Sequence, residues 1–183
     1  FGGDIFIRGV VEVSNFCREN CSYCGMRRDN KNLERYRISL DQLLDTLLNH
    51  RPSSITDINI QAGEDPVAVR QIVLPLIREI RGRTNLGVSV CLGTLGHEEY
   101  AQLSEAGASY YIIKLETGEP ELYRRLLAPG TLPERIQAIR HLASTGWSVS
   151  SGLILGLPGQ IQDHILKTIE LLEDLPLTGC SVS

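Results

Sequence analysis

The feature that most constrains the fold is a regular alternation of short β-branched runs with amphipathic segments of helical length. Strands are predicted at 5–14, 57–63, 87–93, 109–115, 148–157 and 179–183. Helices are predicted between them at 39–50, 66–82, 97–106, 119–127, 131–145 and 160–174. Repeating units of roughly 25 to 35 residues are typical of βαβ crossovers. Strands such as 110–113 are apolar on nearly both faces, as parallel strands covered by helices must be. The alternation therefore predicts an α/β fold with a parallel sheet.

Such a sheet can be doubly wound and open, or it can curve into a TIM-like barrel. A G-x-G-x-x-G motif after the first strand would indicate the open form, but that strand leads to Ser14-Asn15-Phe16-Cys17. Polar or glycine-rich segments follow the strands at 61–65, 116–118 and 156–160, and in a barrel these share the rim where active sites are built. We expect a TIM-like (βα) partial barrel with about six parallel strands, formed by one domain over residues 1–183. Both ends look cut, so we expect a fragment of a fuller barrel, truncated at the C-terminus.

Composition argues against several classes of protein. The net charge of -4 and the pI near 5.6 are unlike those of a nucleic-acid-binding surface, which needs an excess of clustered Lys and Arg. The sequence has no apolar run long enough to cross a bilayer, and its start lacks a basic region followed by an apolar one. We therefore expect a cytoplasmic protein that binds neither nucleic acid nor membrane.

Three of the five cysteines, Cys17, Cys21 and Cys24, fall within eight positions of one loop. This crowding favours metal binding over a disulfide framework. Thiolates suit iron-sulfur clusters or zinc, but no histidine lies nearby in sequence to complete a tetrahedral zinc site. A 4Fe-4S cluster held by three cysteines leaves one iron open to an outside ligand. The alternatives are a zinc site completed by a distant Cys91 or Cys180, and three unligated thiols.

The loop also carries a family resemblance. The C-x-x-x-C-x-x-C motif after a first strand, with Tyr23 before its last cysteine, resembles the radical S-adenosylmethionine superfamily. The stretch 24–37, CGMRRDNKNLERYR, is similar to the branch that contains the FeFe-hydrogenase maturase HydE, with methylornithine synthase and biotin synthase as looser relatives. The resemblance implies two cofactors, a 4Fe-4S cluster on the three cysteines and S-adenosyl-L-methionine, and it places Tyr23 among the residues that bind the cofactor.

The resemblance assigns cofactor contacts to two glutamates. The segment 61–65, QAGED, is similar to the family's Gly-Gly-Glu element, which implies that Glu64 holds the methionine amino group. An exposed acidic turn is the alternative. Glu116 matches a Glu-Thr pair beside the cofactor, where it would bind ribose hydroxyls or the amino group. The preceding Lys114-Leu115 departs from an Arg-His pair in the HydE pattern, and simple pairing of Lys114 with Glu116 is the alternative there.

The second half of the chain supplies the remaining matches. Arg135, in the first turn of a helix capped by Thr131, matches the arginine that clamps the methionine carboxylate; a surface arginine is the alternative. The strand 152–160, GLILGLPGQ, resembles the adenine-contacting strand, with Gly152, Ile154 and Gly156 at the cofactor. Trp147, Cys91 and Cys180 are interpreted as packing residues.

These observations give one main hypothesis and two alternatives. The chain is expected to be a radical enzyme that cleaves S-adenosylmethionine reductively and directs a 5'-deoxyadenosyl radical at a small substrate inside the barrel, with a HydE-like role in maturing the FeFe-hydrogenase active site. The first alternative is a biosynthetic enzyme similar to methylornithine synthase or biotin synthase. The second is a zinc-stabilised binding module without catalysis. An electron would come from a reductant protein such as ferredoxin or flavodoxin.

Overall fold

The computed structural model describes residues 7–183, and these form two compact units. The first unit contains residues 7–16 and 35–109, and the second contains 17–34 and 110–183. Positions 5 and 6 of the first predicted strand lie outside the described residues. The expectation of a single domain stays a prediction, and each unit is described by itself.

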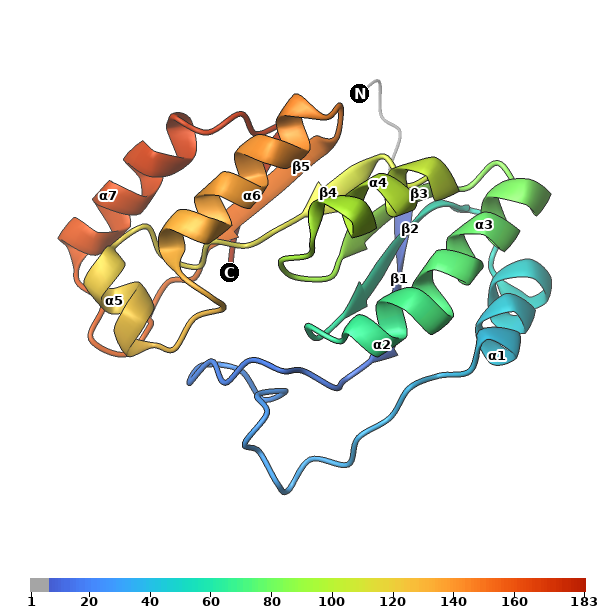
Figure 1. Cartoon of the computed structure of the whole chain (residues 1–183), viewed down its shortest axis with the longest axis horizontal. Helices are drawn as coiled ribbons and strands as arrows, with labels where there is room; N and C mark the ends of the chain where they lie inside the picture. The colour runs from blue at the N-terminus through green and yellow to red at the C-terminus, as the bar shows by residue number, and fades with distance from the viewer. Residues whose placement is uncertain (1–6) are drawn as a thin grey trace. The chain divides into compact units, whose positions relative to one another are not determined.

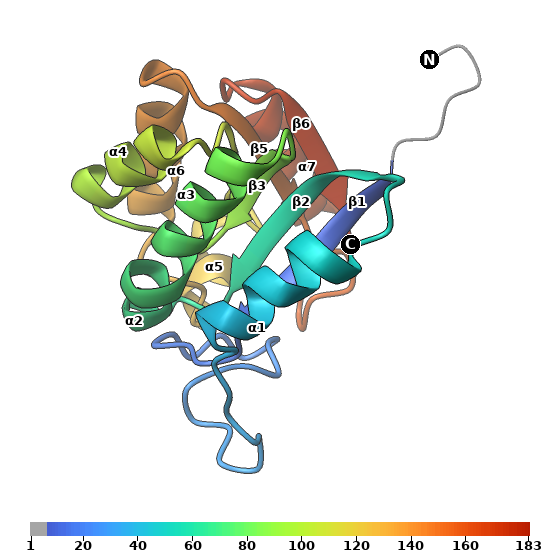
Figure 2. The ribbon, with the colours of Figure 1, turned by 90° about the vertical axis from the view of Figure 1, so that its right-hand side faces the viewer.

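The first unit is a parallel sheet with helices along one face (Figures 1 and 2). Strand β2 (Ile55–Ala62) pairs with β1 (Ile7–Ser14) on one side and with β3 (Gly87–Cys91) on the other. The helical segments are α1 (Leu40–Asp45), η1 (Thr46–His50), α2 (Pro66–Ala68), η2 (Val69–Val73), α3 (Leu74–Arg83) and α4 (His97–Ala106). The buried core includes Ile58, Ile60, Ile77 and Val90.

The helix starts of this unit follow from local side-chain chemistry. Ser39 and Gln42 form a capping box at α1, and the Asp65 carboxylate accepts hydrogen bonds from the N–H groups of Val67 and Ala68 at α2. The two predicted helices at 39–50 and 66–82 exist, but each includes a five-residue π-helical stretch. Hydrophobic periodicity does not distinguish a π-turn from an α-turn over so short a segment.

The second unit repeats the parallel arrangement. Strand β5 (Ser148–Leu153) pairs with β4 (Tyr110–Ile112) on one side and with β6 (Gly179–Val182) on the other. Its helices are α5 (Pro120–Arg125), α6 (Leu132–Ser144) and α7 (Gln162–Glu173). Thr131 and Glu134 form the predicted capping box at α6.

Two strands of this unit are shorter than predicted. Strand β4 ends at Ile112, although Glu116 later makes an isolated parallel bridge to Leu153. Strand β5 ends at Leu153 because the chain turns at Gly156, whose φ of +80° is left-handed. Trp147 is buried edge-on against Tyr111, as expected of a packing residue. Cys180 is exposed, so its interpretation as a packing residue was wrong.

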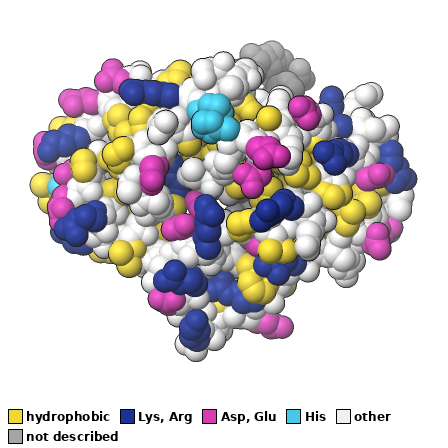
Figure 3. Space-filling model, viewed as in Figure 1, with side chains coloured by type: hydrophobic (Ala, Val, Ile, Leu, Met, Phe, Trp, Pro, Cys, Tyr) yellow, Lys and Arg dark blue, Asp and Glu magenta, His cyan; other side chains and the backbone are white. Residues whose placement is uncertain are grey.

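Six parallel strands alternating with helices confirm the predicted partial (βα) fold. Within residues 7–183, no helix is long and apolar enough to cross a membrane. Figure 3 shows positive and negative side chains on one face of the molecule. The expectation that the protein does not bind nucleic acid stays a prediction.

Candidate functional site

The cysteine loop, residues 17–34, is held in a defined shape within the second unit. Backbone bonds run from Ser22 N to Leu126 O at 2.9 Å and from Cys24 N to Cys21 O at 3.0 Å. Cys21 is buried, whereas Cys17 and Cys24 are partly exposed. The loop therefore presents two accessible thiols beside one that is shielded from water.

The three thiols are close enough for their charges to interact. The pKa of Cys21 is raised to about 11, mainly by burial; a hydrogen bond with Tyr23 opposes this shift, and the charges of Cys17 and Cys24 add to it. Among residues 7–183, no three His, Cys, Asp or Glu side chains are placed around one metal ion. A 4Fe-4S cluster makes a different demand, because each cysteine binds a separate iron.

Tyr23 connects the loop to the rest of the second unit. Its ring packs with Ile154 against the buried side chains of Leu122, Leu126 and Leu157. Burial raises the pKa of the Tyr23 hydroxyl, and the nearby Cys21 and Glu116 raise it further while Arg135 opposes them. Tyr23 thus remains a neutral hydrogen-bonding group among three of the predicted site residues.

Glu116 is fixed beside strand β5 by its own backbone. Its N–H donates to Gly152 O at 3.0 Å, and its carbonyl oxygen accepts from Ile154 N at 3.0 Å. Its φ of +65° is left-handed, a conformation that is uncommon for residues other than glycine and clusters at functional sites. Burial raises the pKa of its carboxyl, although Lys114 and Arg135 oppose the shift. The structure thus brings together Glu116, Gly152 and Ile154.

One carboxylate oxygen of Glu116 has unused bonding capacity. Oε2 is buried and accepts no hydrogen bond from any residue in the described part of the chain. The Lys114 ammonium donates to Ser183 Oγ at 3.0 Å, and its charge acts on Glu116 without a direct hydrogen bond. A buried oxygen of this kind requires a donor, and a ligand hydroxyl or ammonium would supply one.

Arg135 is also buried, with only 3% of its surface exposed, in the first turn of α6. Its charge acts on both Tyr23 and Glu116. The alternative of a surface arginine is therefore wrong, and a buried guanidinium suits a carboxylate ligand.

The glycines of the 152–160 segment have local explanations. A Cβ atom at Gly152 would lie 2.1 Å from Ser181 O on strand β6, so the neighbouring strand already excludes a side chain there. Gly156 has open space around it, its φ is positive, and its N–H donates to Gln160 Oε1 at 2.7 Å. Contacts from Gly152 and Gly156 to an adenine ring stay predictions.

Glu64 belongs to the first unit and is buried at 7% exposure, which contradicts the alternative of an exposed acidic turn. Its Oε1 accepts a hydrogen bond from Thr94 N at 3.2 Å. A Cβ at Gly93 would come within 2.2 Å of Glu64 Cγ, so only glycine lets the glutamate occupy this position. The supporting roles of Gly93 and Thr94 were not predicted.

Sequence reasoning also missed Asp65, a buried carboxylate of the first unit that accepts several hydrogen bonds. Arg37 donates to its Oδ2 from Nε at 2.7 Å and to its Oδ1 from Nη2 at 3.0 Å, and Ser14 Oγ donates to Oδ2 at 2.7 Å. Burial alone would raise the pKa of Asp65, but the bonds from Arg37, Ser14 and Ala68 N hold it below its ordinary value. The Asp65-Pro66 pair at a helix start could have revealed the cap, though not its arginine partner.

The Asp65 contacts join the two segments that flank the cysteine loop in sequence. Tyr36 N donates to Asn15 Oδ1 at 2.8 Å, and the guanidinium carbon of Arg37 lies 4.0 Å from the centre of the Phe16 ring. Residues 14–16 immediately precede Cys17, and residues 35–37 immediately follow the loop. Both ends of the loop are therefore fixed to each other within the first unit.

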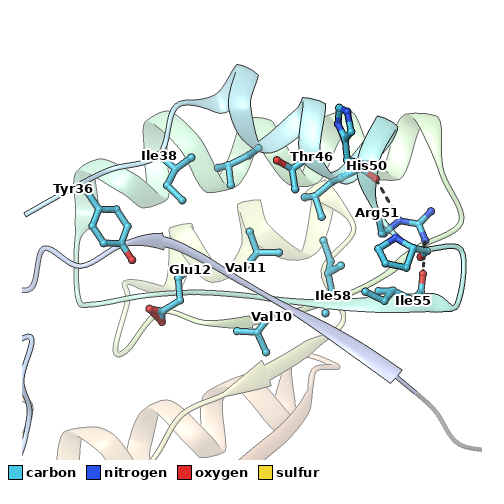
Figure 4. A pocket seen from close by; sticks show the side chains of 14 residues that line it. Val10, Val11, Glu12, Tyr36, Ile38, Thr46, His50, Arg51, Ile55 and Ile58 are labelled. Carbon is cyan, nitrogen blue, oxygen red and sulfur yellow. Dashed lines mark hydrogen bonds between the residues drawn. The ribbon is translucent and has the colours of Figure 1, made fainter.

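A separate cavity of about 420 Å³ lies between β1, β2 and the α1–η1 segment (Figure 4). Its lining is mainly apolar and includes none of the site residues predicted from the sequence. None of the three cysteines lines this cavity.

Comparison with known proteins identifies the family. The profile of the radical SAM superfamily matches residues 11–172. The chain belongs to the radical SAM superfamily. Members of this superfamily are enzymes that use a 4Fe-4S cluster and S-adenosylmethionine. This membership favours the cluster over the zinc-stabilised module.

Individual relatives come from several branches. The chain is 34% identical over 173 residues to the [FeFe] hydrogenase maturase subunit HydE of Thermotoga maritima, covering 94% of this chain and 49% of the relative. It is 29% identical to the biotin synthase of Francisella philomiragia, covering 100% of this chain and 59% of the relative. A crystal structure of methylornithine synthase (PylB) matches with a TM-score of 0.90 at 21% identity, over 100% of this chain and 54% of that one. The chain thus spans about half of the length of each of these proteins, and the last likeness shows the fold alone.

The residues present fit the cofactors of the superfamily. Three thiols without histidine are the donor set of an open 4Fe-4S cluster. The buried Glu116 Oε2, which lacks a donor among residues 7–183, fits a hydroxyl or ammonium of S-adenosylmethionine. The buried guanidinium of Arg135 complements its carboxylate.

Proposed function

We propose that this chain forms the cofactor-binding part of a radical enzyme that cleaves S-adenosylmethionine reductively and acts on a small substrate. The observation that supports this most is the placement of Glu116 beside Gly152 and Ile154, with Tyr23 of the cysteine loop packed on the same group. Residues far apart in sequence that the motif assigns to one cofactor are thereby neighbours within the second unit.

Each residue has a role in this proposal. Cys17, Cys21 and Cys24 hold the cluster, and Tyr23 hydrogen-bonds at Cys21. Arg135 binds the methionine carboxylate, Glu64 the amino group and Glu116 a ribose hydroxyl, while Gly152, Ile154 and Gly156 line the adenine ring. When bound, the reduced cluster supplies the electron that splits S-adenosylmethionine into methionine and a 5'-deoxyadenosyl radical. The buried residues around Glu116 keep water away from that carboxylate, which strengthens its hydrogen bond to the ligand.

We propose further that the enzyme has a HydE-like role in FeFe-hydrogenase maturation. The 34% identity to HydE and the similarity of residues 24–37 support this role. Lys114-Leu115 departs from the HydE pattern, and a biosynthetic reaction like that of methylornithine synthase or biotin synthase is the alternative. A ferredoxin or flavodoxin would donate the electron, and a reducing compartment such as the cytoplasm would keep the cysteines available as thiolates.

Anaerobic reconstitution tests the proposal. We expect a brown protein with about four iron and four sulfide per chain, which cleaves S-adenosylmethionine when dithionite is added. Cys24→Ser should lose iron, whereas Cys180→Ser should load normally because Cys180 is exposed on strand β6. A colourless zinc protein, or a loaded protein that leaves S-adenosylmethionine intact, would overturn the proposal.

A complementation experiment tests the role in maturation. A strain lacking its own HydE should regain hydrogenase activity when it expresses the protein, and it should not regain it with the Cys24→Ser variant. Failure of the active protein to restore hydrogenase, with S-adenosylmethionine cleavage intact, would favour the biosynthetic alternative.

A further inference from the structure

The helix-free face of the first unit's sheet carries polar side chains. Figure 4 shows Val11 and Ile58 pointing toward the α1 side, and Val10 and Glu12 pointing to the opposite side of β1. In the register of the sheet, Glu12 lies opposite Gln61, and Asn59 lies opposite Ser89. Because side chains alternate along a strand, these residues share one face.

Hydrogen bonds link the four polar residues into one chain. Ser89 Oγ lies 3.1 Å from Asn59 Oδ1, Asn59 Nδ2 donates to Gln61 Oε1 at 3.1 Å, and Gln61 Nε2 donates to Glu12 Oε1 at 2.6 Å. The two amide steps run in the same direction and end on the Glu12 carboxylate, while Ser89 Oγ also lies 3.1 Å from Ile58 O. Asn59 and Ser89 are buried, so the inner part of the network is fixed, whereas Glu12 is only half-buried. The network thus orients a carboxylate that a ligand can reach.

The hydrogen-bonding groups that the network leaves unused indicate which kind of ligand this face can bind. In residues 7–183, Glu12 has no ion-pair partner, and its only hydrogen bond comes from Gln61. Its Oε2 can therefore accept from a cation. Each of the Gln61 and Asn59 amides uses one N–H inside the network and has a second N–H to donate. Val10, on the same face and 62% exposed, offers apolar contact beside Glu12.

We propose that this face binds the protonated amine of the enzyme's substrate, with Glu12 as its anionic partner. Resting on the proposed function, this inference names the substrate class: a small molecule with a primary ammonium group, an oxygen acceptor for the free amide N–H groups, and a short carbon skeleton that packs on Val10. A neutral molecule would leave the Glu12 charge unpaired, which is unfavourable at a half-buried position.

Equilibrium binding to the cluster-loaded protein tests the subsite without requiring cleavage of S-adenosylmethionine. The probes are ornithine, which has two amines, norvaline, which lacks the side-chain amine, and 5-aminopentanoate, which lacks the α-amine. Glu12→Gln should weaken ornithine binding about 10-fold or more, because it removes a charge-assisted hydrogen bond. The probe that lacks the amine in contact with Glu12 should bind the wild-type protein and the variant equally.

Two further variants keep the test decisive. Glu98→Gln is the matched control. Glu98 is an exposed glutamate on α4 that, like Glu12, accepts a hydrogen bond from a glutamine, here from Gln102 Nε2 at 3.2 Å. This variant should bind ornithine like the wild type. Glu12→Asp keeps the charge and should recover part of the affinity. No binding of ornithine by the wild type at tens of millimolar, or equal weakening of all three probes by Glu12→Gln, would overturn the proposal. Cleavage with dithionite, measured separately, shows whether the proposed function fails as well.

Discussion

At the scale of single residues, Glu116 combines three unusual properties: a left-handed backbone, a buried oxygen without a donor in residues 7–183, and a carboxyl pKa above its ordinary value. We expect Glu116→Gln to weaken S-adenosylmethionine binding about 10-fold while leaving the iron content unchanged, because the carboxylate is the stronger acceptor. Equilibrium binding to the loaded protein and an iron assay measure the two quantities.

The raised pKa of Glu116 adds a pH dependence to this prediction. Protonation removes the negative charge that strengthens the hydrogen bond, so wild-type affinity should fall as the pH drops through the raised pKa, and the glutamine variant should lose that component. Equal pH profiles for the two proteins would contradict the assignment of Glu116 to the cofactor.

Asp65 gives a second prediction at this scale. Asp65→Asn should reduce the free energy of unfolding by about 2 kcal/mol at neutral pH, because it leaves Arg37 without its anionic partner. Since the folded-state pKa of Asp65 is lowered, its stabilisation is present above the unfolded value near 3.9 and is lost as the pH falls through the folded value. The difference in unfolding free energy between the variant and the wild type should therefore shrink in acid. Urea unfolding at neutral pH and at a pH below the folded-state pKa of Asp65 measures this change.

The matched control is Asp163→Asn, which breaks an exposed pair with Lys167 on helix α7. Exposed pairs of this type contribute little, so this variant should unfold almost like the wild type. If Asp163→Asn lost as much unfolding free energy as Asp65→Asn, the buried contacts of Asp65 would contribute no more to stability than an exposed ion pair.

At the scale of elements, local sequence signals predicted the helix bounds and caps that depend on neighbouring residues in the sequence. Helix α4 begins and ends where predicted, and Thr131 caps α6 through Glu134. Contacts between distant segments could not be predicted from the sequence. Arg37 and Asp65, for example, are 28 residues apart and share no motif. The early end of β4 has the same origin, since the bridge between Glu116 and Leu153 depends on pairing across strands. Burial of Glu64 and Arg135 likewise follows from packing rather than from either residue's neighbours in sequence.

Strand pairing supplies the prediction for elements. Gly152→Ala should destabilise the second unit by about 2 kcal/mol, because the added Cβ would lie 2.1 Å from Ser181 O and would separate β5 from β6. Thermal unfolding measures the effect. Gly82→Ala is the control: that glycine lies near the end of α3 with nothing within 4 Å of the added atom, so the substitution should be neutral or slightly stabilising.

At the scale of the whole molecule, loading of the cluster should couple to protons and to stability. The pKa of Cys21 is about 11, so this thiol is protonated at neutral pH and must lose its proton to bind iron. Iron incorporation at limiting iron should therefore increase between about pH 7 and pH 9, and the loaded protein should melt at a higher temperature than the unloaded one. Cys21→Ser should flatten the pH dependence and abolish the gain in melting temperature. Loading that does not change with pH would mean that Cys21 is not the buried ligand, because a thiol with so high a pKa cannot bind iron without releasing its proton.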